Sequence, residues 1–414
     1  MSGISRDFAP PFTLIAPFFL VGVLFYTASM IGLFFFDAHL AFNAMSTIAW
    51  VHLYLLGFVM MIIFGAMAQL VPVVIEVGHA AVEFFYIIWP LLGLGTLLMV
   101  LGFAFSIRLL PFGGMMVLLS MLIFAIDLFW TLKKGKHKSI VVSTMGTSNI
   151  FLLLGITSGF IMALGFGGIL GIDPHHWLKA HVFAVFGGYV LLTIMGLSMV
   201  LLPMFGLAHG FDEKPMQRAY KLMIVGVSSV MIGSLINISY LEYFGIGATL
   251  LSLLSYFYQI NLILKTRARK ENDIWVQSLV YAFTTLALSL LLLLVYLFGG
   301  SEAWLISGTW FLMAGFTGFL ITAHLYKIIP FLVWFERYAP LVGKQKVPML
   351  NEMVPMTQAN AQLIFSVIGV SLVGLGLLFG VDALYFSGAS SLVVGALYLV
   401  SSVYTMMQYG KEVL

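Results

Sequence analysis

The chain has 414 residues, of which 62% are hydrophobic and only 8% are charged, and its formal net charge is +3. Soluble globular domains of this length carry far more charge, so the composition predicts an integral membrane protein and gives no indication of nucleic-acid binding. Because cysteine is absent, disulfides, thiolate metal ligands and covalently attached c-type haem are excluded within this chain.

Apolar segments recur along the whole chain, and each is long enough to cross a bilayer core of ~30 Å as a helix of about 20 residues. The first segment has no small-residue cleavage site behind it, so we interpret it as a retained helix and not as a signal peptide. The sequence therefore predicts an all-α polytopic membrane protein. Its twelve transmembrane helices are predicted at 12–35, 47–75, 84–106, 110–131, 145–170, 177–206, 220–240, 245–264, 275–298, 303–335, 359–380 and 383–407.

Basic residues collect in the loops after even-numbered helices, which predicts that these loops and both termini are cytoplasmic. The localisation that follows is a bacterial inner (plasma) membrane, with the lipid bilayer as the first partner. The basic loops are KKGKHK (133–138), KPMQRAYK (214–221), KTRARK (265–270) and GKQK (343–346).

Helix 47–75 contains two glycines and a proline whose spacing recurs 131 residues later and again 127 residues after that, with alanine in place of one glycine in the last set. Because the repeat is four helices long, each copy enters the membrane in the same direction. We therefore expect three parallel four-helix units in one membrane domain, 1–414, arranged with pseudo-threefold symmetry and covering approximately 1–140, 141–270 and 271–414. The three sets of landmarks are Gly57, Gly65 and Pro72, then Gly188, Gly196 and Pro203, then Gly315, Ala323 and Pro330.

Three histidines are predicted within the hydrocarbon. His52 and His181 lie 20 and 22 residues before the proline of their helices, which puts both roughly 30 Å from it, at one depth. His324 lies only six residues before Pro330, nearer the cytoplasm. Such histidines face the interior of a bundle, either as neutral groups that hydrogen-bond between helices or as metal ligands.

Two imidazoles at one depth, with no cysteine, suit the axial positions of a six-coordinate b-type haem. Copper or zinc would need a third ligand, for which His175 and His176 are the candidates, and His324 is a further candidate metal ligand. Asp127 is the carboxylate well inside a helix. It is either a proton-relay group or a buried acid that is protonated or hydrogen-bonded, whereas Lys327 is expected only to extend to the helix end.

The segment HLYLLGFVMMIIFGAMAQLVP, which begins at His52, resembles the haem-ligand segment of helix II in subunit I of the haem-copper oxidase superfamily, in its cbb3 and nitric oxide reductase-like branches. The number of helices, the inside termini and the parallel repeats resemble that family over the whole chain. The resemblance implies that His52 is an axial ligand of a low-spin haem. It also implies a respiratory, electron-transport or oxidoreductase-like role, with a cytochrome or copper protein as redox partner at the outer face.

The sequence departs from that family at its catalytic centre. Gly308 and Trp310 stand where the family's helix X has histidine, helix 220–240 has no histidine pair for copper, and Val185 stands where many oxidases have a tyrosine. We therefore expect electron transfer or gas and redox sensing through a b-type haem clamped by His52 and His181, without ordinary dioxygen reduction. The alternative is a transporter or assembly factor for copper, haem or another small solute, with these two residues and His324 as stations across the membrane.

Overall fold

The computed structural model describes residues 10–35, 44–135 and 139–411, and its elements are helices throughout these ranges. Twelve helices are long and apolar enough to cross a membrane, so the predicted polytopic, all-α membrane protein is confirmed. They are Phe12–Phe35, Met45–Ile75, Val82–Ala104, Ile107–Lys134, Ile140–Phe166, Pro174–Gly206, Lys214–Leu235, Ser239–Thr266, Ile274–Leu297, Glu302–Arg337, Met356–Phe379 and Asp382–Gln408.

The largest differences from the predicted bounds are at helix starts. Helix α9 (Lys214–Leu235) begins six residues before its predicted start, because its first two turns are polar and were interpreted as part of a basic loop. Helix α6 (Ile140–Phe166) likewise begins five residues early, where the hydroxyl of Ser139 accepts a hydrogen bond from the backbone N–H of Val142. A capped helix end is polar by nature, so hydropathy places it in the loop.

The chain divides into two compact units. The first unit is Met1–Pro10 with Met67–Lys270, and the second is Pro11–Ala66 with Glu271–Leu414. The boundary runs through α3 (Met61–Ile75). The first unit contains α4 (Phe85–Ala104), α5 (Leu110–Lys134), α6, α7 (Pro174–Val182), α8 (Leu192–Gly206), α9 and α10 (Ser239–Thr266). The second unit contains α1 (Phe12–Gly32), α2 (Met45–His52), α11 (Ile274–Leu297), α12 (Glu302–Trp310), α13 (Gly318–Arg337), α14 (Met356–Phe379) and α15 (Asp382–Gln408).

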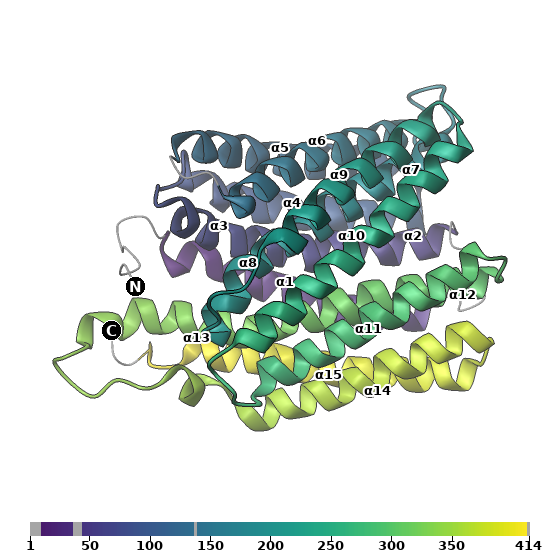
Figure 1. Ribbon diagram of the computed structural model, residues 1–414. Coiled ribbons are helices and arrows are strands. Elements are labelled where there is room, and N and C mark those ends of the chain that lie inside the picture. The colour runs from purple at the N-terminus through teal and green to yellow at the C-terminus, as the bar shows by residue number, and fades with distance from the viewer. Residues whose placement is uncertain (1–9, 36–43, 136–138, 412–414) are drawn as a thin grey trace. The chain divides into compact units, whose positions relative to one another are not determined.

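Three pairs of consecutive helices pack as antiparallel hairpins: α4 with α5 and α9 with α10 in the first unit, and α14 with α15 in the second (Figure 1). In each of the two hairpins of the first unit, a serine of the second helix donates a hydrogen bond to a backbone carbonyl oxygen of the first helix. The hydroxyl of Ser120 in α5 donates to the carbonyl oxygen of Ile88 at 2.9 Å, and that of Ser252 in α10 donates to the carbonyl oxygen of Ala219 at 2.6 Å. Corresponding residues therefore hold corresponding helices in these two hairpins.

A π-helical segment interrupts three of the long spans, each time after a short α-helix. The segments are η2 (Leu53–Met60), η5 (Phe183–Leu191) and η6 (Phe311–Thr317), and the helices that follow them are α3, α8 and α13. Single π-helical turns within α-helices are uncommon and occur frequently at functional sites. His52 immediately precedes η2, and His181 lies two residues before η5.

Glycine lets another helix pack closely on each π-helical segment. A Cβ atom added at Gly57 would lie 2.5 Å from the ring of Phe25, and one at Gly188 would lie 2.4 Å from the ring of Phe151. At Gly315 the same atom would lie 2.7 Å from Cβ of Thr285. These three glycines are landmarks of the predicted repeat, and each is a point of close approach by the preceding long helix.

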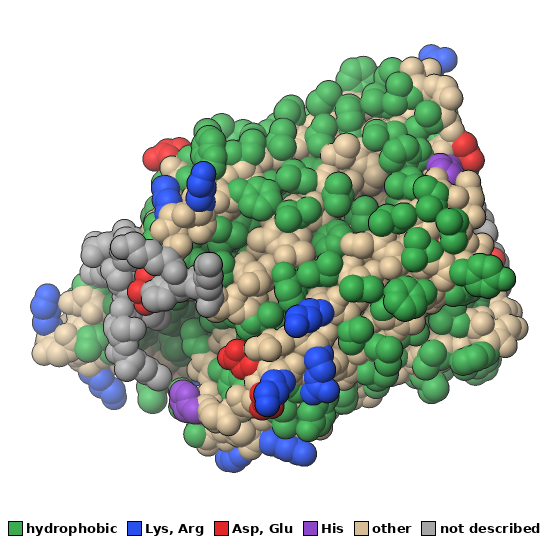
Figure 2. All heavy atoms as spheres, turned by 45° about the horizontal axis from the view of Figure 1, so that its top comes forward, with side chains coloured by type: hydrophobic (Ala, Val, Ile, Leu, Met, Phe, Trp, Pro, Cys, Tyr) green, Lys and Arg blue, Asp and Glu red, His purple; other side chains and the backbone are tan. Residues whose placement is uncertain are grey.

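The outer surface is mostly hydrophobic, as a surface in contact with lipid requires. Figure 2 shows this apolar face, with Lys and Arg side chains gathered mainly in its left and lower parts. Large exposed apolar side chains include Leu94, Val225 and Leu251, each near the middle of a membrane span.

Candidate functional site

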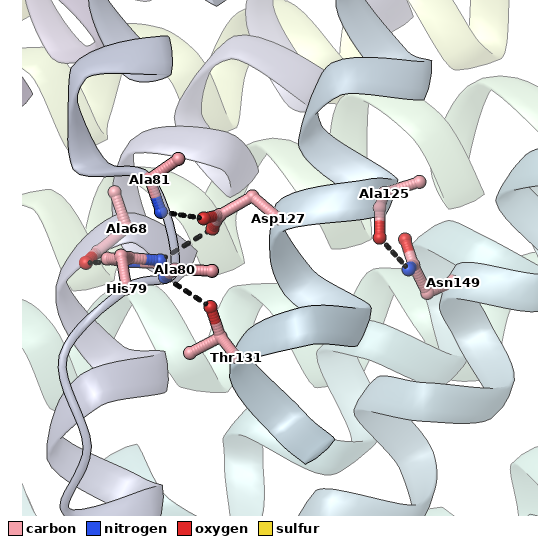
Figure 3. A network of polar contacts seen from close by, with 8 residues as sticks. All are labelled: Ala68, His79, Ala80, Ala81, Ala125, Asp127, Thr131 and Asn149. Atoms are coloured by element: carbon pink, nitrogen blue, oxygen red, sulfur yellow. Dashed lines mark hydrogen bonds and ion pairs between the residues drawn. The ribbon is translucent and has the colours of Figure 1, made fainter. Parts of the chain in front are cut away.

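A network of polar contacts in the first unit joins His79 to Asp127 (Figure 3). His79 lies in the loop after α3, and Asp127 lies on α5. The imidazole Nδ1 is 2.7 Å from Oδ2 of Asp127, and the two side chains are only 3% and 1% exposed. The ring also packs on Phe85, with 4.7 Å between ring centroids. An ionisable pair is thus buried at the end of a membrane span.

The local sequence explains where the imidazole lies. Pro72 has no backbone N–H, so the carbonyl oxygen of Ala68, four residues earlier in α3, lacks its usual helical donor. Glu76 has a left-handed backbone with φ of 55°, which ends α3 and turns the chain back. His79 Nε2 then donates to the oxygen of Ala68 at 2.7 Å. A carbonyl oxygen only accepts, so Nε2 carries a proton.

The rest of the loop is held to α5 in the same place. The backbone N–H of Ala81 donates to Oδ1 of Asp127 at 2.9 Å, and that of Ala80 donates to the hydroxyl of Thr131 at 3.0 Å. Both carboxylate oxygens of Asp127 therefore accept hydrogen bonds. Of the two roles expected for this residue, the geometry agrees with a hydrogen-bonded buried acid, while the role as a proton relay stays a prediction.

His79 was not among the candidate residues singled out from the sequence, and its part in this network was missed. The signal was Pro72: a proline within a helix leaves a carbonyl oxygen unpaired, and a donor a few residues downstream can reach it. No periodicity pointed to Asp127 as the second partner, because it lies 48 residues further along the chain.

His52 lies at the end of α2, in the second unit. Its Nδ1 is 2.8 Å from the carbonyl oxygen of Ile48, one turn earlier, so Nδ1 carries a proton. Next to it, Trp50 donates from its indole N–H to the oxygen of Ser29 and stacks on Tyr54 with 5.3 Å between ring centroids. The hydroxyl of Tyr54, in η2, donates to the oxygen of Met313 in η6 at 3.1 Å. Aromatic side chains thus fix the helix on both sides of His52.

His181 lies at the end of α7, in the first unit, and its ring rests on α6. Nδ1 is 2.9 Å from the carbonyl oxygen of Gly155, which requires the proton to be on Nδ1. A Cβ atom at Gly159 would lie 2.6 Å from Cε1 of the ring, so glycine leaves the space that the imidazole occupies. The orientation of His181 is therefore set by a neighbouring helix, whereas that of His52 is set by its own.

Both histidines have the tautomer that an axial haem ligand needs. With a proton on Nδ1, the neutral ring has its lone pair on Nε2, the nitrogen that coordinates iron or another metal, and a carbonyl partner of Nδ1 fixes the tautomer and the ring plane. His52 and His181 belong to different compact units. The haem shared between them, expected from the sequence, stays a prediction.

His324 lies on α13 in the second unit, 8% exposed. Its Nδ1 is 2.7 Å from the carbonyl oxygen of Leu320, and its ring meets Trp275 edge-on with 6.2 Å between ring centroids. Close by in the chain, Lys327 Nζ is 2.6 Å from Oδ2 of Asp273 and 5.7 Å from the Trp275 ring centroid. Lys327 therefore does more than extend to the helix end: it forms a half-buried ion pair.

Trp310, which stands where the resembled family has a histidine, donates from its indole N–H to the oxygen of Val370 at 2.9 Å. The candidate third ligands also have structural contacts, and His176 Nε2 is 3.1 Å from the oxygen of Leu235. The backbone N–H of His175 donates to Asp173, which caps α7. Within residues 10–35, 44–135 and 139–411, no three His, Asp or Glu side chains are grouped as a metal site would need.

Neither the protein-family models nor the curated proteins compared with the chain gave a match.

Proposed function

We propose that this chain is a haem-binding membrane protein on a scaffold like that of oxidase subunit I, serving electron transfer or gas and redox sensing without ordinary dioxygen reduction. The observation that carries the proposal is the state of His52 and His181. Each has Nδ1 engaged by a backbone carbonyl, at 2.8 and 2.9 Å, and each lies one or two residues before a π-helical segment of a buried span. Nε2 is then the nitrogen suited to iron.

The proposal includes three parallel four-helix units, cytoplasmic termini and a bacterial inner membrane. The recurrence of a π-helical segment in three spans supports the repeat, as does a close glycine contact in each. The matching hydrogen bonds of Ser120 and Ser252 support the repeat independently. They lie in the third and fourth helices of the proposed four-helix repeats, whereas the π-helical segments and glycine contacts involve the first and second. The concentration of Lys and Arg in four loops supports the orientation.

A b-type haem supplies one-electron redox chemistry when bound, and this chain would supply ligation and surroundings. His52 and His181 are the proposed axial ligands, Ile48 and Gly155 fix their tautomers, and Gly159 leaves room for the second ring. Since both histidines are placed in the outer part of their helices by the spacing from the inner prolines, the proposed redox partner is a cytochrome or copper protein at the outer face.

The test is the optical spectrum of the purified protein, oxidised and dithionite-reduced, with metal analysis of the same sample. A low-spin b-type spectrum is expected, and His52→Ala and His181→Ala should each remove it. His209→Ala is the matched control, because that histidine is exposed in the loop after α8. A colourless protein, or a spectrum that survives both substitutions, would overturn the proposal.

A transporter or assembly factor for copper, haem or another small solute is the second candidate. It is favoured by one observation: buried His324 and the Lys327–Asp273 ion pair both lie against Trp275, well along α13 from the π-helical segment. Polar groups at a second depth suit a path more than a single cofactor site. Copper bound in place of haem, and lost in His324→Ala, would favour this candidate over the first.

A further inference from the structure

His79 and Asp127 form a buried, closely hydrogen-bonded pair that the proposed haem site does not use. We propose that the pair is a proton-binding site: it carries one shared proton, and only in that state does it hold the loop 76–81 against α5. The inference is independent of haem binding, because every residue it uses lies in the first unit, away from both proposed ligands in the sequence.

The hydrogen bonds define the proton count. His79 Nε2 donates to the oxygen of Ala68, so one ring proton is committed. One further proton must lie between Nδ1 and Oδ2 of Asp127, which are 2.7 Å apart. If that proton is lost, the neutral ring has one N–H for two acceptors, so His79 must give up its bond to either Ala68 or Asp127. If another proton is gained, it goes to the carboxyl group, which then accepts more weakly from Nδ1. Either change weakens the link that runs from Ala68 through His79 to Asp127.

The second hairpin of the same unit indicates that an ionisable pair is unnecessary for fixing such a loop. Gln259 on α10 stands seven residues after Ser252, as Asp127 stands seven after Ser120. Its side chain is fully buried, and Oε1 accepts the backbone N–H of Met216 at the start of α9, at 3.1 Å. A neutral amide therefore performs the mechanical role there. The carboxylate and imidazole of the first hairpin bring something more, namely a proton that can be exchanged.

The groups that pack directly against His79 and Asp127 do not themselves titrate. Helix α3 presents the backbone oxygen of Ala68 and α4 presents the ring of Phe85, neither of which titrates. From α5 itself, Thr131 contributes a hydroxyl. The ionisable residues of the loop and of the flanking helix ends are exposed to solvent, and they are Glu76, Glu83, Lys133 and Lys134.

Absence of cysteine makes a direct test possible. A spin label on Val77→Cys would be the only label on the chain, and its mobility reports whether the loop is held. The mobility is measured from about pH 2.5 to pH 10, a range that extends beyond the ordinary carboxyl value of about 4 and the ordinary imidazole value of about 6.5 on both sides. We expect an immobile label at intermediate pH and an about tenfold rise in the mobile-to-immobile ratio at both extremes, equivalent to about 1.4 kcal/mol.

Asp127→Asn is the decisive variant, because its amide can donate to Nδ1 and still accept from Ala81. The loop should then stay held at alkaline pH, where the unaltered chain releases it. His79→Gln, which has no titrating group at this position, should also lose the alkaline release. Thr131→Val is the matched control: it removes the hydrogen bond from Ala80 but no proton, so it should raise mobility equally at every pH. Alkaline release that persists unchanged in both Asp127→Asn and His79→Gln would overturn the proposal.

Discussion

The imidazole Nε2 of His79 lies 2.7 Å from the carbonyl oxygen of Ala68, the very oxygen that Pro72 leaves without a helical donor. The proline that marks the inner end of the first repeat thus creates an acceptor, and the loop that follows supplies its donor. The same histidine then reaches Asp127 through its other nitrogen. One residue therefore links the end of α3 to α5.

Replacing Pro72 by alanine tests this relationship. Pro72→Ala restores a backbone N–H that competes with His79 for the oxygen of Ala68. We expect the loop 76–81 to exchange its amide hydrogens faster, by about tenfold if His79 loses a bond of ~1 kcal/mol or slightly more. Pro203→Ala in α8 is the control, because His209 in the loop after that helix is exposed. Unchanged exchange in Pro72→Ala would mean that His79 does not depend on the proline.

The close approach at Gly188 predicts a large steric effect. A Cβ atom there would lie 2.4 Å from the ring of Phe151, so Gly188→Leu forces α6 and η5 apart. We expect the free energy of unfolding to fall by about 3 kcal/mol or more, measured as a lower Tm in detergent. Gly247→Ala on α10 is the contrasting variant. Nothing lies within 4 Å of its Cβ, so alanine should stabilise the helix by roughly 0.5–1 kcal/mol.

The ion pair between Lys327 and Asp273 should show strong coupling. Lys327→Met removes the ammonium group that pairs with Oδ2 of Asp273, a carboxylate only 21% exposed, at an expected cost of about 1–3 kcal/mol in the free energy of unfolding. Asp273→Asn should lower the free energy of unfolding by a similar amount, because the ammonium group of Lys327 then has no carboxylate to pair with at this position. The double variant should be less destabilised than the sum of the two. Additive losses in thermal unfolding would show that the pair contributes little.

Arg337 holds the end of the last helix. Its guanidinium donates to the carbonyl oxygens of Met407, at 3.0 Å, and of Tyr409, while the side chain is 6% exposed. Arg337→Met should therefore release the last turn of α15, seen as rapid hydrogen exchange at 404–409 with the centre of that helix unchanged. Arg337→Lys should restore only part of the protection, because lysine lacks the planar fork that reaches two oxygens. Full protection in Arg337→Met would contradict this role.

Features that depend on residues close by in the sequence could be predicted from the sequence. Helix α1 begins at Phe12, as predicted, because an apolar run long enough for a bilayer follows a proline-rich start. Gly57, Gly188 and Gly315 were singled out by spacing alone, and each is a point of close packing. Lys327 was misjudged, because its partner Asp273 lies 54 residues away on another helix, and no local pattern indicates such a pairing.

The sequence by itself determined the class of protein and the twelve membrane-spanning helices, because solvation by lipid depends on the summed hydropathy of a segment and hardly on its neighbours. Only the tertiary structure decided which polar groups meet. Polar groups from separate elements are brought within 3 Å of each other by the packing of helices that are uniformly apolar in sequence. The three pairs are His79 with Asp127, Lys327 with Asp273, and His181 with Gly155. Uniform hydropathy fixes the depth of a residue along a helix but not the direction in which its side chain points.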